Sequence, residues 1–349
     1  MEDEVVRRRK WMTRDEFLDL LGAANLIPGP NSTELAIHIG HRQAGWAGLL
    51  VAGSSFILPA MLIVMSFAWA YVRYGSLPQV AGILYGVKPV IIAIVLQALW
   101  SLARTAIKSK ILAAVGIVAV ILTVLRIHEL LVLFGAGLAA VLARTIVRRS
   151  KDLKSLVSAP AFAMFFQAGG AGATAFGLWP LFLFFLKVGA ILYGSGYVLL
   201  AFIRADLVER WHWLTEAQLL DAIAVGQVTP GPVFTTATFI GYVLGGVPGA
   251  ALATLGIFLP SFVFVALSHP LVPRIRASRR AGAFLDGVNV AALGLMAAVT
   301  WQLGQAAIVD LTTAALALIA LALLLRFKLN SAWLVLGGSA VGAAFRLRG

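Results

Sequence analysis

The chain has no cysteine among its 349 residues. This absence excludes disulfides, cysteine-ligated iron–sulfur clusters and thiol redox chemistry, and it leaves no thiolate for a metal site. Histidines are also few, and their spacing does not cluster in the way that metal ligands do. The five are His38, His41, His128, His212 and His269. His38 and His41 share one helix face without a third ligand nearby, so we expect no metal and no cofactor.

Charge is scarce as well. Only 12% of the residues are charged, whereas a soluble domain carries roughly 25%. The chain is 60% hydrophobic, with a mean hydropathy of +0.93. Several apolar runs approach or exceed the ~20 residues that cross a bilayer as a helix. They are 46–71, 111–125, 181–203 and 311–325. The composition therefore predicts an all-α polytopic membrane protein with the lipid bilayer as its surroundings.

The charge that is present is mostly basic, with a net charge of +13. Basic residues of membrane proteins gather in cytoplasmic loops, so we attribute the excess to topology and expect no nucleic acid as a partner. The P-loop pattern G-x-x-x-x-G-K-[ST] is absent, which argues against ATP as the direct energy source. We also find no flavin or NAD fingerprint, and expect that the protein is not an enzyme.

The sequence repeats itself about 200 residues apart. "WMTRDEFLDLLGAANLIPGPNST", from Trp11, aligns with "WLTEAQLLDAIAVGQVTPGPVFT", from Trp213. Glycines and Leu-Pro pairs further on match in one register, which indicates an internal duplication. We predict a first repeat at 1–147, a basic and then Gly/Ala-rich linker at 148–180, and a second repeat at 181–349. The apolar segment 181–203 precedes Trp213 and has no counterpart before Trp11, so the first repeat is expected to lack its leading helix.

The distribution of basic residues predicts how the two repeats are oriented. If both Pro-Gly-Pro segments enter the membrane and return, twenty of the 28 basic residues lie in loops on the side of the N-terminus, and six lie on the other side. This bias is expected for cytoplasmic loops. The predicted crossings are 46–71, 79–100, 111–125, 130–147, 181–203, 244–267, 282–302, 306–325 and 331–345. The repeats then have inverted topology, and each contributes one broken, re-entrant helix.

The Pro-Gly-Pro breaks predict a binding site. Two prolines remove two backbone donors and interrupt a helix, and non-helical backbone at membrane depth persists only where protein or water covers it. A proline also suits the first turn of a new helix, whose free N–H groups and positive dipole end attract an anion. Broken helices of inverted repeats place transporter sites near the midplane. The alternative is that both breaks are kinks packed against neighbouring helices.

The candidate substrate-binding residues follow from these breaks and from polar residues near them. They are Asn25, Pro28, Gly29, Pro30, Asn31, Ser32, Thr33, Lys88, Gln227, Pro230, Gly231, Pro232, Thr235, Thr236 and Asn289. Lys88 lies inside a predicted crossing, where a cation is a functional candidate, and it aligns with Asn289. The alternative for Lys88 is a side chain that snorkels to the interface.

Glu34 is a separate candidate because it lies in the first turn after Pro30. An ionised carboxylate there competes with an anion, so we consider Glu34 a candidate for coupling transport to protons. Two alternatives are equally compatible with the sequence: an acid that caps the helix, or a partner for Lys88. Asp19 and Asp221 match between the repeats, and we interpret them first as packing residues and only second as proton carriers.

At these residues the sequence resembles the chromate ion transporter family. The resemblance is carried by "LIPGPNSTELA" at 26–36, "FLKVGAILYGSGYVLL" at 185–200 and "VTPGPVFTTATFIGYVLGGVPGA" at 228–250. It implies a secondary transporter of the bacterial plasma membrane that exports chromate and confers resistance to it. The family's Phe-Gly-Gly type motif reads Tyr-Gly-Ser-Gly here, at 193–196.

Two alternatives to chromate export remain. Chromate is a tetrahedral dianion like sulfate, so a transporter or channel for another small oxyanion such as sulfate is the main one. A membrane enzyme that reduces chromate is disfavoured because the chain has no cysteine and no fingerprint for a redox cofactor. A homo-oligomer is compatible with the sequence.

Overall fold

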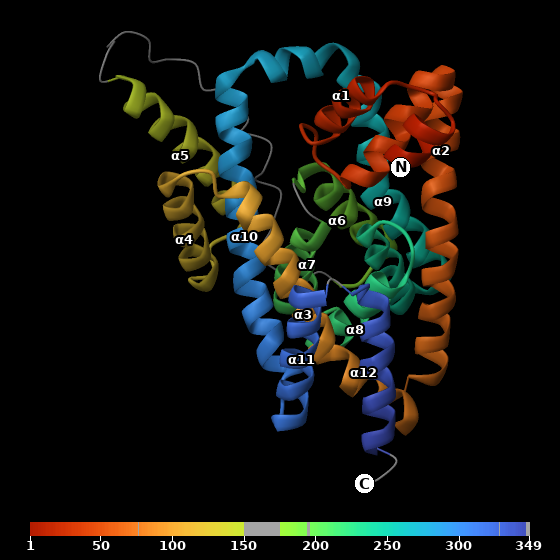
Figure 1. The fold of residues 1–349 in the computed structure, drawn as a ribbon. Coiled ribbons are helices and arrows are strands. Elements are labelled where there is room, and N and C mark those ends of the chain that lie inside the picture. The colour runs from red at the N-terminus through yellow and green to blue at the C-terminus, as the bar shows by residue number, and fades with distance from the viewer. Residues whose placement is uncertain (76, 150–174, 194–195, 328, 347–349) are drawn as a thin grey trace.

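The fold was examined in a computed structural model, which describes residues 1–75, 77–149, 175–193, 196–327 and 329–346 (Figure 1). All regular elements in these ranges are helical. Most of the predicted linker at 148–180 lies outside them. The long elements are α1 (Arg14–Ala24), α2 (Asn31–Tyr74), α3 (Pro78–Ala106), α4 (Lys110–Val124), α5 (Glu129–Arg149), α6 (Leu178–Ile191), α8 (Glu216–Val228), α9 (Thr236–Ala277), α10 (Arg279–Ala307), α11 (Leu311–Phe327) and α12 (Ser331–Arg346). The short ones are η1 (Asp3–Arg8), η3 (Gly196–Val198), α7 (Leu199–Ile203), η4 (Arg204–Arg210) and η5 (Val233–Thr235).

Several helices have the length and composition of membrane spans. Four are long and apolar enough to cross a bilayer, at Asn31–Tyr74, Val80–Ala106, Val233–Ser268 and Arg280–Ala307. Shorter apolar helices cover Lys110–Val124, Leu178–Ile191, Leu311–Phe327 and Ser331–Ala344. Large apolar side chains are exposed on them, as on lipid-facing surfaces. The all-helical, apolar class is confirmed, and the number of nine crossings stays a prediction.

One predicted crossing, 181–203, was wrong as a single unbroken helix. α6 ends at Ile191, and the chain becomes helical again at Gly196. The Leu192 carbonyl accepts a hydrogen bond of 2.8 Å from the Gly29 N–H, in the first Pro-Gly-Pro segment. A carbonyl at a helix end needs such a partner where water is excluded. The break is therefore stabilised by a residue more than 160 positions earlier in the chain.

The two halves have the same local geometry before each Pro-Gly-Pro. Thr13 caps α1 and Thr215 caps α8, each in a reciprocal capping box with the residue three positions on. Such boxes satisfy two otherwise free backbone donors. The similarity continues upstream, because the Trp11 N–H bonds the Val5 carbonyl and the Trp213 N–H bonds the Leu207 carbonyl, both at 2.8 Å. The matched geometry therefore begins before Trp11, where the sequence alignment started.

Both long broken helices also fold back at the same kind of elbow. Gly45 in α2 has φ 56° and ψ −138°, and Gly246 in α9 has φ 61° and ψ −151°. This conformation favours glycine because a Cβ would clash with the backbone. On either side of the first elbow, Gly40 and Gly48 bring the two limbs into backbone contact, and the corresponding glycines of α9 do the same. Each long element thus consists of a short limb that follows Pro-Gly-Pro and a longer limb that follows the elbow.

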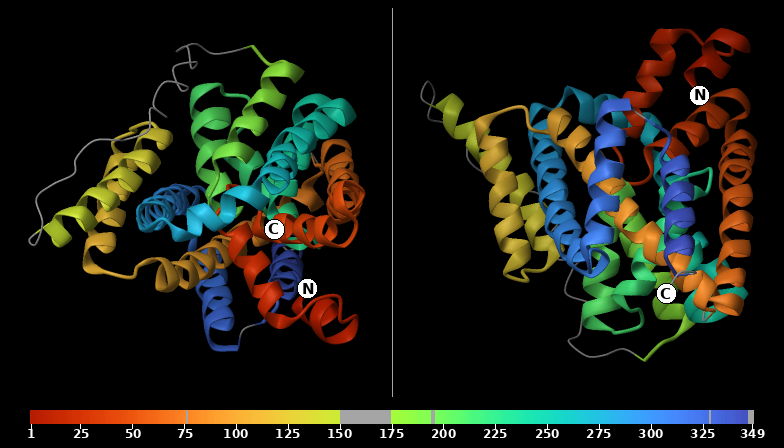
Figure 2. Two further views of the ribbon diagram at one scale, coloured as in Figure 1. Left: turned by 90° about the horizontal axis from the view of Figure 1, so that it is seen from above. Right: turned by 60° about the horizontal axis from the view of Figure 1, so that its bottom comes forward.

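The two halves interlock through α3 and α10. α3 packs against α11 and α12, whereas α10 packs against α4 and α5. At one contact, a Cβ on Gly86 would lie 2.0 Å from the Gly338 carbonyl oxygen, so the helix backbones touch. Figures 1 and 2 show α4 and α5 together at one side of the molecule, next to α10. In Figure 1, α2 ends at the bottom, where α3 begins, and α9 ends at the top, where α10 begins.

Candidate functional site

A cavity of about 520 Å³ lies where both Pro-Gly-Pro segments meet α3 and α10. Six of the candidate residues line it, namely Asn25, Pro30, Asn31, Ser32, Pro232 and Asn289. These residues come from both halves of the chain, so the fold joins two breaks that are far apart in sequence. The remaining walls are formed by the end of α3, the start of α10, η3 and η5.

The first break supplies a helix start at the cavity wall. Pro30 is the N-cap of α2 with an extended backbone and no side-chain cap. Its carbonyl accepts hydrogen bonds from the N–H groups of Thr33 and Glu34, at 2.8 and 3.0 Å. Asn31 and Ser32 occupy the first turn, where the amides have no acceptor within the helix, and both line the cavity. These amides are therefore donors that a ligand can use.

An amide pair closes the loop of this first break. The Asn31 side-chain amide donates to the Asn25 side-chain oxygen at 2.6 Å. Asn25 is exposed, and both residues line the cavity. The pair leaves one further N–H on Asn31 and the whole amino group of Asn25 as donors. These amide N–H groups are neutral, so they can donate hydrogen bonds to an anion without placing a positive charge in the cavity wall.

The second break supplies the matching helix start. Pro232 is the N-cap of η5, also extended and without a side-chain cap. Its carbonyl accepts from both the N–H and the hydroxyl of Thr235, each at 2.9 Å. Val233 and Phe234 follow in the cavity wall. Thr235 itself is buried and uses its hydroxyl within the turn, so it supports the helix start instead of lining the cavity.

The charges at the cavity favour an anion. Asp286 of α10 is in the wall, but it pairs with Lys108 at 2.7 Å and lies 3.9 Å from Arg144. Two cations therefore face one carboxylate. Lys108 also lines the cavity, and its side chain is 63% exposed. Asn289, one turn further along α10 than Asp286, adds a neutral amide.

The other candidate residues are not in the cavity wall. They are Pro28, Gly29, Thr33, Lys88, Gln227, Pro230, Gly231, Thr235 and Thr236. Most belong to the same breaks and lie behind or beside the lining residues. Pro28 and Gly29 are buried, whereas Pro230 and Gly231 are exposed.

Lys88 has a different partner from the one considered in the sequence. Its ammonium lies 3.3 Å from an Asp221 oxygen, and the Tyr71 hydroxyl donates to the other oxygen at 2.9 Å. The alternative in which Glu34 is the partner of Lys88 was wrong. Asp221 is buried at the contact between α8 and α3. The contact therefore joins α3 to α8 through one side-chain pair.

Glu34 is buried without a compensating charge. Its exposed fraction is 0%, no cation pairs with its carboxyl within the described residues, and the polar group beside it is the Ser261 hydroxyl. A Cβ on Gly29 would lie 2.2 Å from Oε1 of Glu34 and 2.8 Å from the Ser261 hydroxyl oxygen, so the carboxyl packs directly on the first break. Burying a carboxyl group without a cation beside it is costly.

Several lining residues were missed in the sequence. Gly196 and Val198 line the cavity because helix α6 ends before them, at Ile191. The glycines of "YGSG" inside an apolar run were the available signal, since glycine weakens a helix. Lys108 and Asp286 had no signal of this kind, because only the packing of α3 and α10 brings the two together.

Comparisons with known proteins place this chain in a family. The family model described as "Chromate transporter" matches residues 1–141 and 179–343. The chain belongs to the chromate transporter family. As a chromate transporter family member, it is 34% identical over 349 residues to the chromate transport protein of Cupriavidus metallidurans, covering 98% of this chain and 86% of that protein. It is 32% identical to the chromate transport protein of Pseudomonas aeruginosa, covering 86% of this chain and 74% of that protein.

A further relative has a similar name. The probable chromate transport protein of Synechococcus elongatus is 31% identical over 326 residues, covering 92% of this chain and 82% of that protein. No solved structure matches the chain. The family resemblance stated from the sequence is therefore confirmed.

Proposed function

We propose that this family member moves chromate across the bacterial plasma membrane, as a secondary transporter that exports the anion. The observation that carries the proposal is the cavity of about 520 Å³, in which the starts of two helices from the two halves meet Asn289. The names of its relatives give the substrate. Sulfate has the same tetrahedral geometry and charge, so transport of a sulfate-like oxyanion, or its passage through a channel, is the second candidate function.

The proposed architecture is a pair of repeats in opposite orientation, each with one re-entrant Pro-Gly-Pro segment. Matched capping boxes, matched glycine elbows and the interlocked packing of α3 and α10 support two equivalent repeats. The opposite ends at which α2 and α9 finish support inversion (Figure 1). In such transporters the site lies between the repeats, and one repeat rocks against the other to expose it alternately.

The substrate would be held by neutral donors and guided by nearby cations. Free N–H groups at the two helix starts and the amides of Asn25, Asn31 and Asn289 are the donors. Lys108, which is mostly exposed, together with Arg144 raises the anion concentration at the entrance. Amide and backbone donors bind strongly enough for specificity and weakly enough for release.

Lys88 would act in a second conformation. It occupies in α3 the position that Asn289 occupies in α10, and here it is held by Asp221. When inverted repeats exchange their arrangements, the cavity opens at the corresponding place in the other repeat. We therefore expect Lys88 to leave Asp221 and approach the substrate in the conformation that opens to the opposite side.

Glu34 is the proposed coupling group. It is fully buried against Gly29, which belongs to the break that forms the cavity wall. A buried carboxyl without a cation binds a proton, and it loses that proton when a conformational change gives it water or a positive partner. Movement of the break would expose Glu34, so proton release can accompany substrate movement.

Uptake of radiolabelled chromate into proteoliposomes tests the cavity. Asn289→Asp places a negative charge in the wall, and we expect it to reduce the initial rate at low chromate by at least about tenfold, since an unfavourable charge contact costs more than ~1.4 kcal/mol. Asn330→Asp is the matched control, because Asn330 is exposed and only caps α12. Equal rates for Asn289→Asp and the control, with normal insertion of both, would exclude this cavity as the substrate site.

Two further arms address substrate and coupling. Excess sulfate that abolishes uptake indicates a general oxyanion site, whereas uptake that resists sulfate indicates selectivity for chromate. Glu34→Gln should preserve chromate binding and uncouple it from a pH gradient. A pH-sensitive dye inside the vesicles measures the proton movement. Undiminished proton movement in Glu34→Gln would remove Glu34 from the coupling mechanism.

A further inference from the structure

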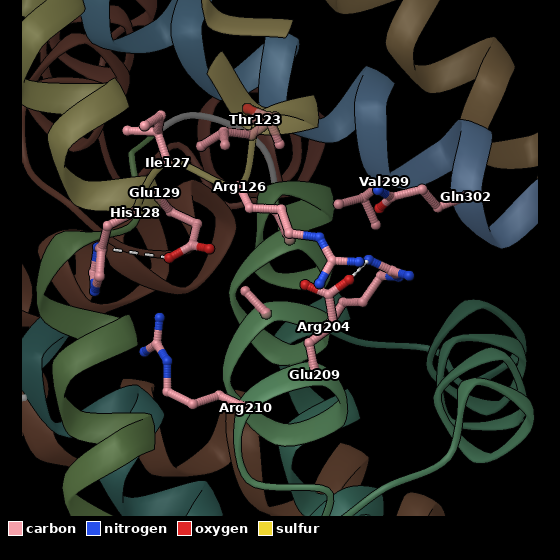
Figure 3. A pocket seen from close by; sticks show the side chains of 13 residues that line it. Thr123, Arg126, Ile127, His128, Glu129, Arg204, Glu209, Arg210, Val299 and Gln302 are labelled. Carbon is pink, nitrogen blue, oxygen red and sulfur yellow. Dashed lines mark hydrogen bonds and ion pairs between the residues drawn. The ribbon is translucent and has the colours of Figure 1, made fainter. Parts of the chain in front are cut away.

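A second cavity, of about 290 Å³, is separate from the one formed by the Pro-Gly-Pro segments. Its walls are the link between α4 and α5, the segment from Ala201 to Arg210, and part of α10. Figure 3 shows the guanidinium groups of Arg126 and Arg204 near one another beside Glu209, and that of Arg210 apart from them, toward His128 and Glu129. Three arginines from two distant parts of the chain therefore line one cavity.

Two of these arginines are held in place by carboxylates. Arg204 pairs with Glu209 and Glu216, each at 2.6 Å. Arg210 pairs with Asp206, which also lies 2.7 Å from Lys187. These ion pairs fix the orientation of the guanidiniums without using all of their donors, because a guanidinium has five N–H groups. The Nε of Arg204 is buried and donates to no acceptor in the described residues.

Arg126 has no ion pair within the described residues, and its backbone is unusual. It has φ 60°, and it follows the C-cap of α4 in a Schellman turn, with N–H bonds from Arg126 to Thr123 and from Ile127 to Leu122, both of 3.0 Å. Glycine is the usual residue at this left-handed position, since other side chains are strained there. An arginine at such a position is explained if its charged group is needed in the cavity.

The second cavity is adjacent to the first along one stretch of chain. Val198 lines the cavity of the Pro-Gly-Pro segments, whereas Ala201 and Ala205 line the arginine cavity. Spacings of three and four residues place these positions on one helix face. Leu199 and Leu200, between them, are buried. The lining residues of the two cavities are therefore separated by only a few turns of this helical stretch.

We propose that the cavity of Arg126, Arg204 and Arg210 is a second binding site for a tetrahedral oxyanion dianion, on the route to the Pro-Gly-Pro cavity. This inference rests on the proposed function, because it assigns the same class of substrate to both cavities. Guanidinium groups suit such anions, since their planar fork donates two parallel hydrogen bonds to two oxygens. Two carboxylates, Glu129 and Glu209, are also in the wall; they oppose the anion and keep the site weak enough to release it.

Equilibrium dialysis of the full chain in lipid nanodiscs against radiolabelled chromate tests the proposal. We expect two bound equivalents in the unmodified chain. Arg126→Gln should weaken one of them on the order of tenfold, the loss expected for a hydrogen bond to a charged group. Glu129→Gln should tighten the same site. Arg326→Gln, at an exposed arginine in the last turn of α11, is the control and should leave both equivalents unchanged.

The outcomes separate this inference from the proposed function. One equivalent that is lost in Asn289→Asp and unaffected in Arg126→Gln and Glu129→Gln would overturn the second site and leave the transport site standing. One equivalent that is lost only in Arg126→Gln would support the arginine cavity and overturn the Pro-Gly-Pro site. No bound chromate in a monodisperse chain would overturn both. Opposite shifts in Arg126→Gln and Glu129→Gln exclude a purely structural role, because damage to the fold weakens binding in both.

Discussion

Replacement of Gly29 by alanine tests the packing of the first break most directly. Gly29 has φ 137°, and a Cβ there would lie 2.2 Å from Oε1 of Glu34 and 2.8 Å from the Ser261 hydroxyl oxygen. The change therefore adds two costs. Backbone strain at such a φ costs about 1–3 kcal/mol, and the forced displacement of packed neighbours costs about 1–3 kcal/mol more.

Gly45→Ala is a matched control that isolates the second cost. Gly45 also has a positive φ, of 56°, but a Cβ there would meet nothing within 4 Å. Both variants thus suffer backbone strain, and only Gly29→Ala suffers the collision with Glu34. We expect the two to differ by about 1–3 kcal/mol in the free energy of unfolding.

The assay follows unfolding in detergent by tryptophan fluorescence and chromate uptake after reconstitution. Gly29→Ala should unfold at lower denaturant than Gly45→Ala and lose most of its uptake, because the Gly29 N–H also bonds the Leu192 carbonyl. Gly45→Ala should transport normally when it is inserted. The same stability and the same uptake in both variants would refute the close packing of Glu34 on Gly29.

Two further predictions concern helix contacts. Asp221→Asn leaves Lys88 without its partner and should lower the free energy of unfolding by about 2–4 kcal/mol. The loss should be smaller than for a fully buried pair, because the Lys88 side chain is 21% exposed. Combining Asp221→Asn with Lys88→Met should recover most of the lost stability, and a double variant as unstable as Asp221→Asn would contradict the ion pair. Gly86→Leu should separate α3 from α12, so that the purified protein no longer gives a monodisperse peak on size-exclusion chromatography. Gly135→Leu is the control and should keep that peak, because a Cβ on Gly135 meets nothing within 4 Å. Equal elution profiles of the two variants would contradict the contact between α3 and α12.

The candidate site shows which structural features of this protein can be predicted from its sequence. Pro-Gly-Pro stops a helix wherever it occurs, because proline lacks a donor and its ring clashes with the preceding turn. Both breaks and their new helix starts at Asn31 and Val233 were therefore predictable from local chemistry. The break after Ile191 was not predictable in this way, because the Leu192 carbonyl accepts its hydrogen bond from Gly29, which lies more than 160 residues earlier in the chain.

The pairing of charges was equally dependent on packing. Asp221 and Lys88 are separated by more than 130 residues, and the sequence suggested Glu34, not Asp221, as a partner for the lysine. Only the contact of α8 with α3 decides that Asp221 is the partner. In the same way, Lys108 meets Asp286 because α3 and α10 cross. A charged residue in an apolar helix indicates a candidate functional site, but which residue pairs with it depends on the helix that packs beside it.

The sequence by itself determined the apolar helical class, the positions of the two breaks and the family, because each of these depends on composition, on spacing or on the local chemistry of proline and glycine. The tertiary structure alone decided that both breaks share one cavity, that α3 and α10 each pack on the helices of the other half, and that three arginines face a second cavity. The reason is physical: local propensities act over a few residues, whereas a cavity wall or an ion pair is made by backbones that approach one another from distant parts of the chain.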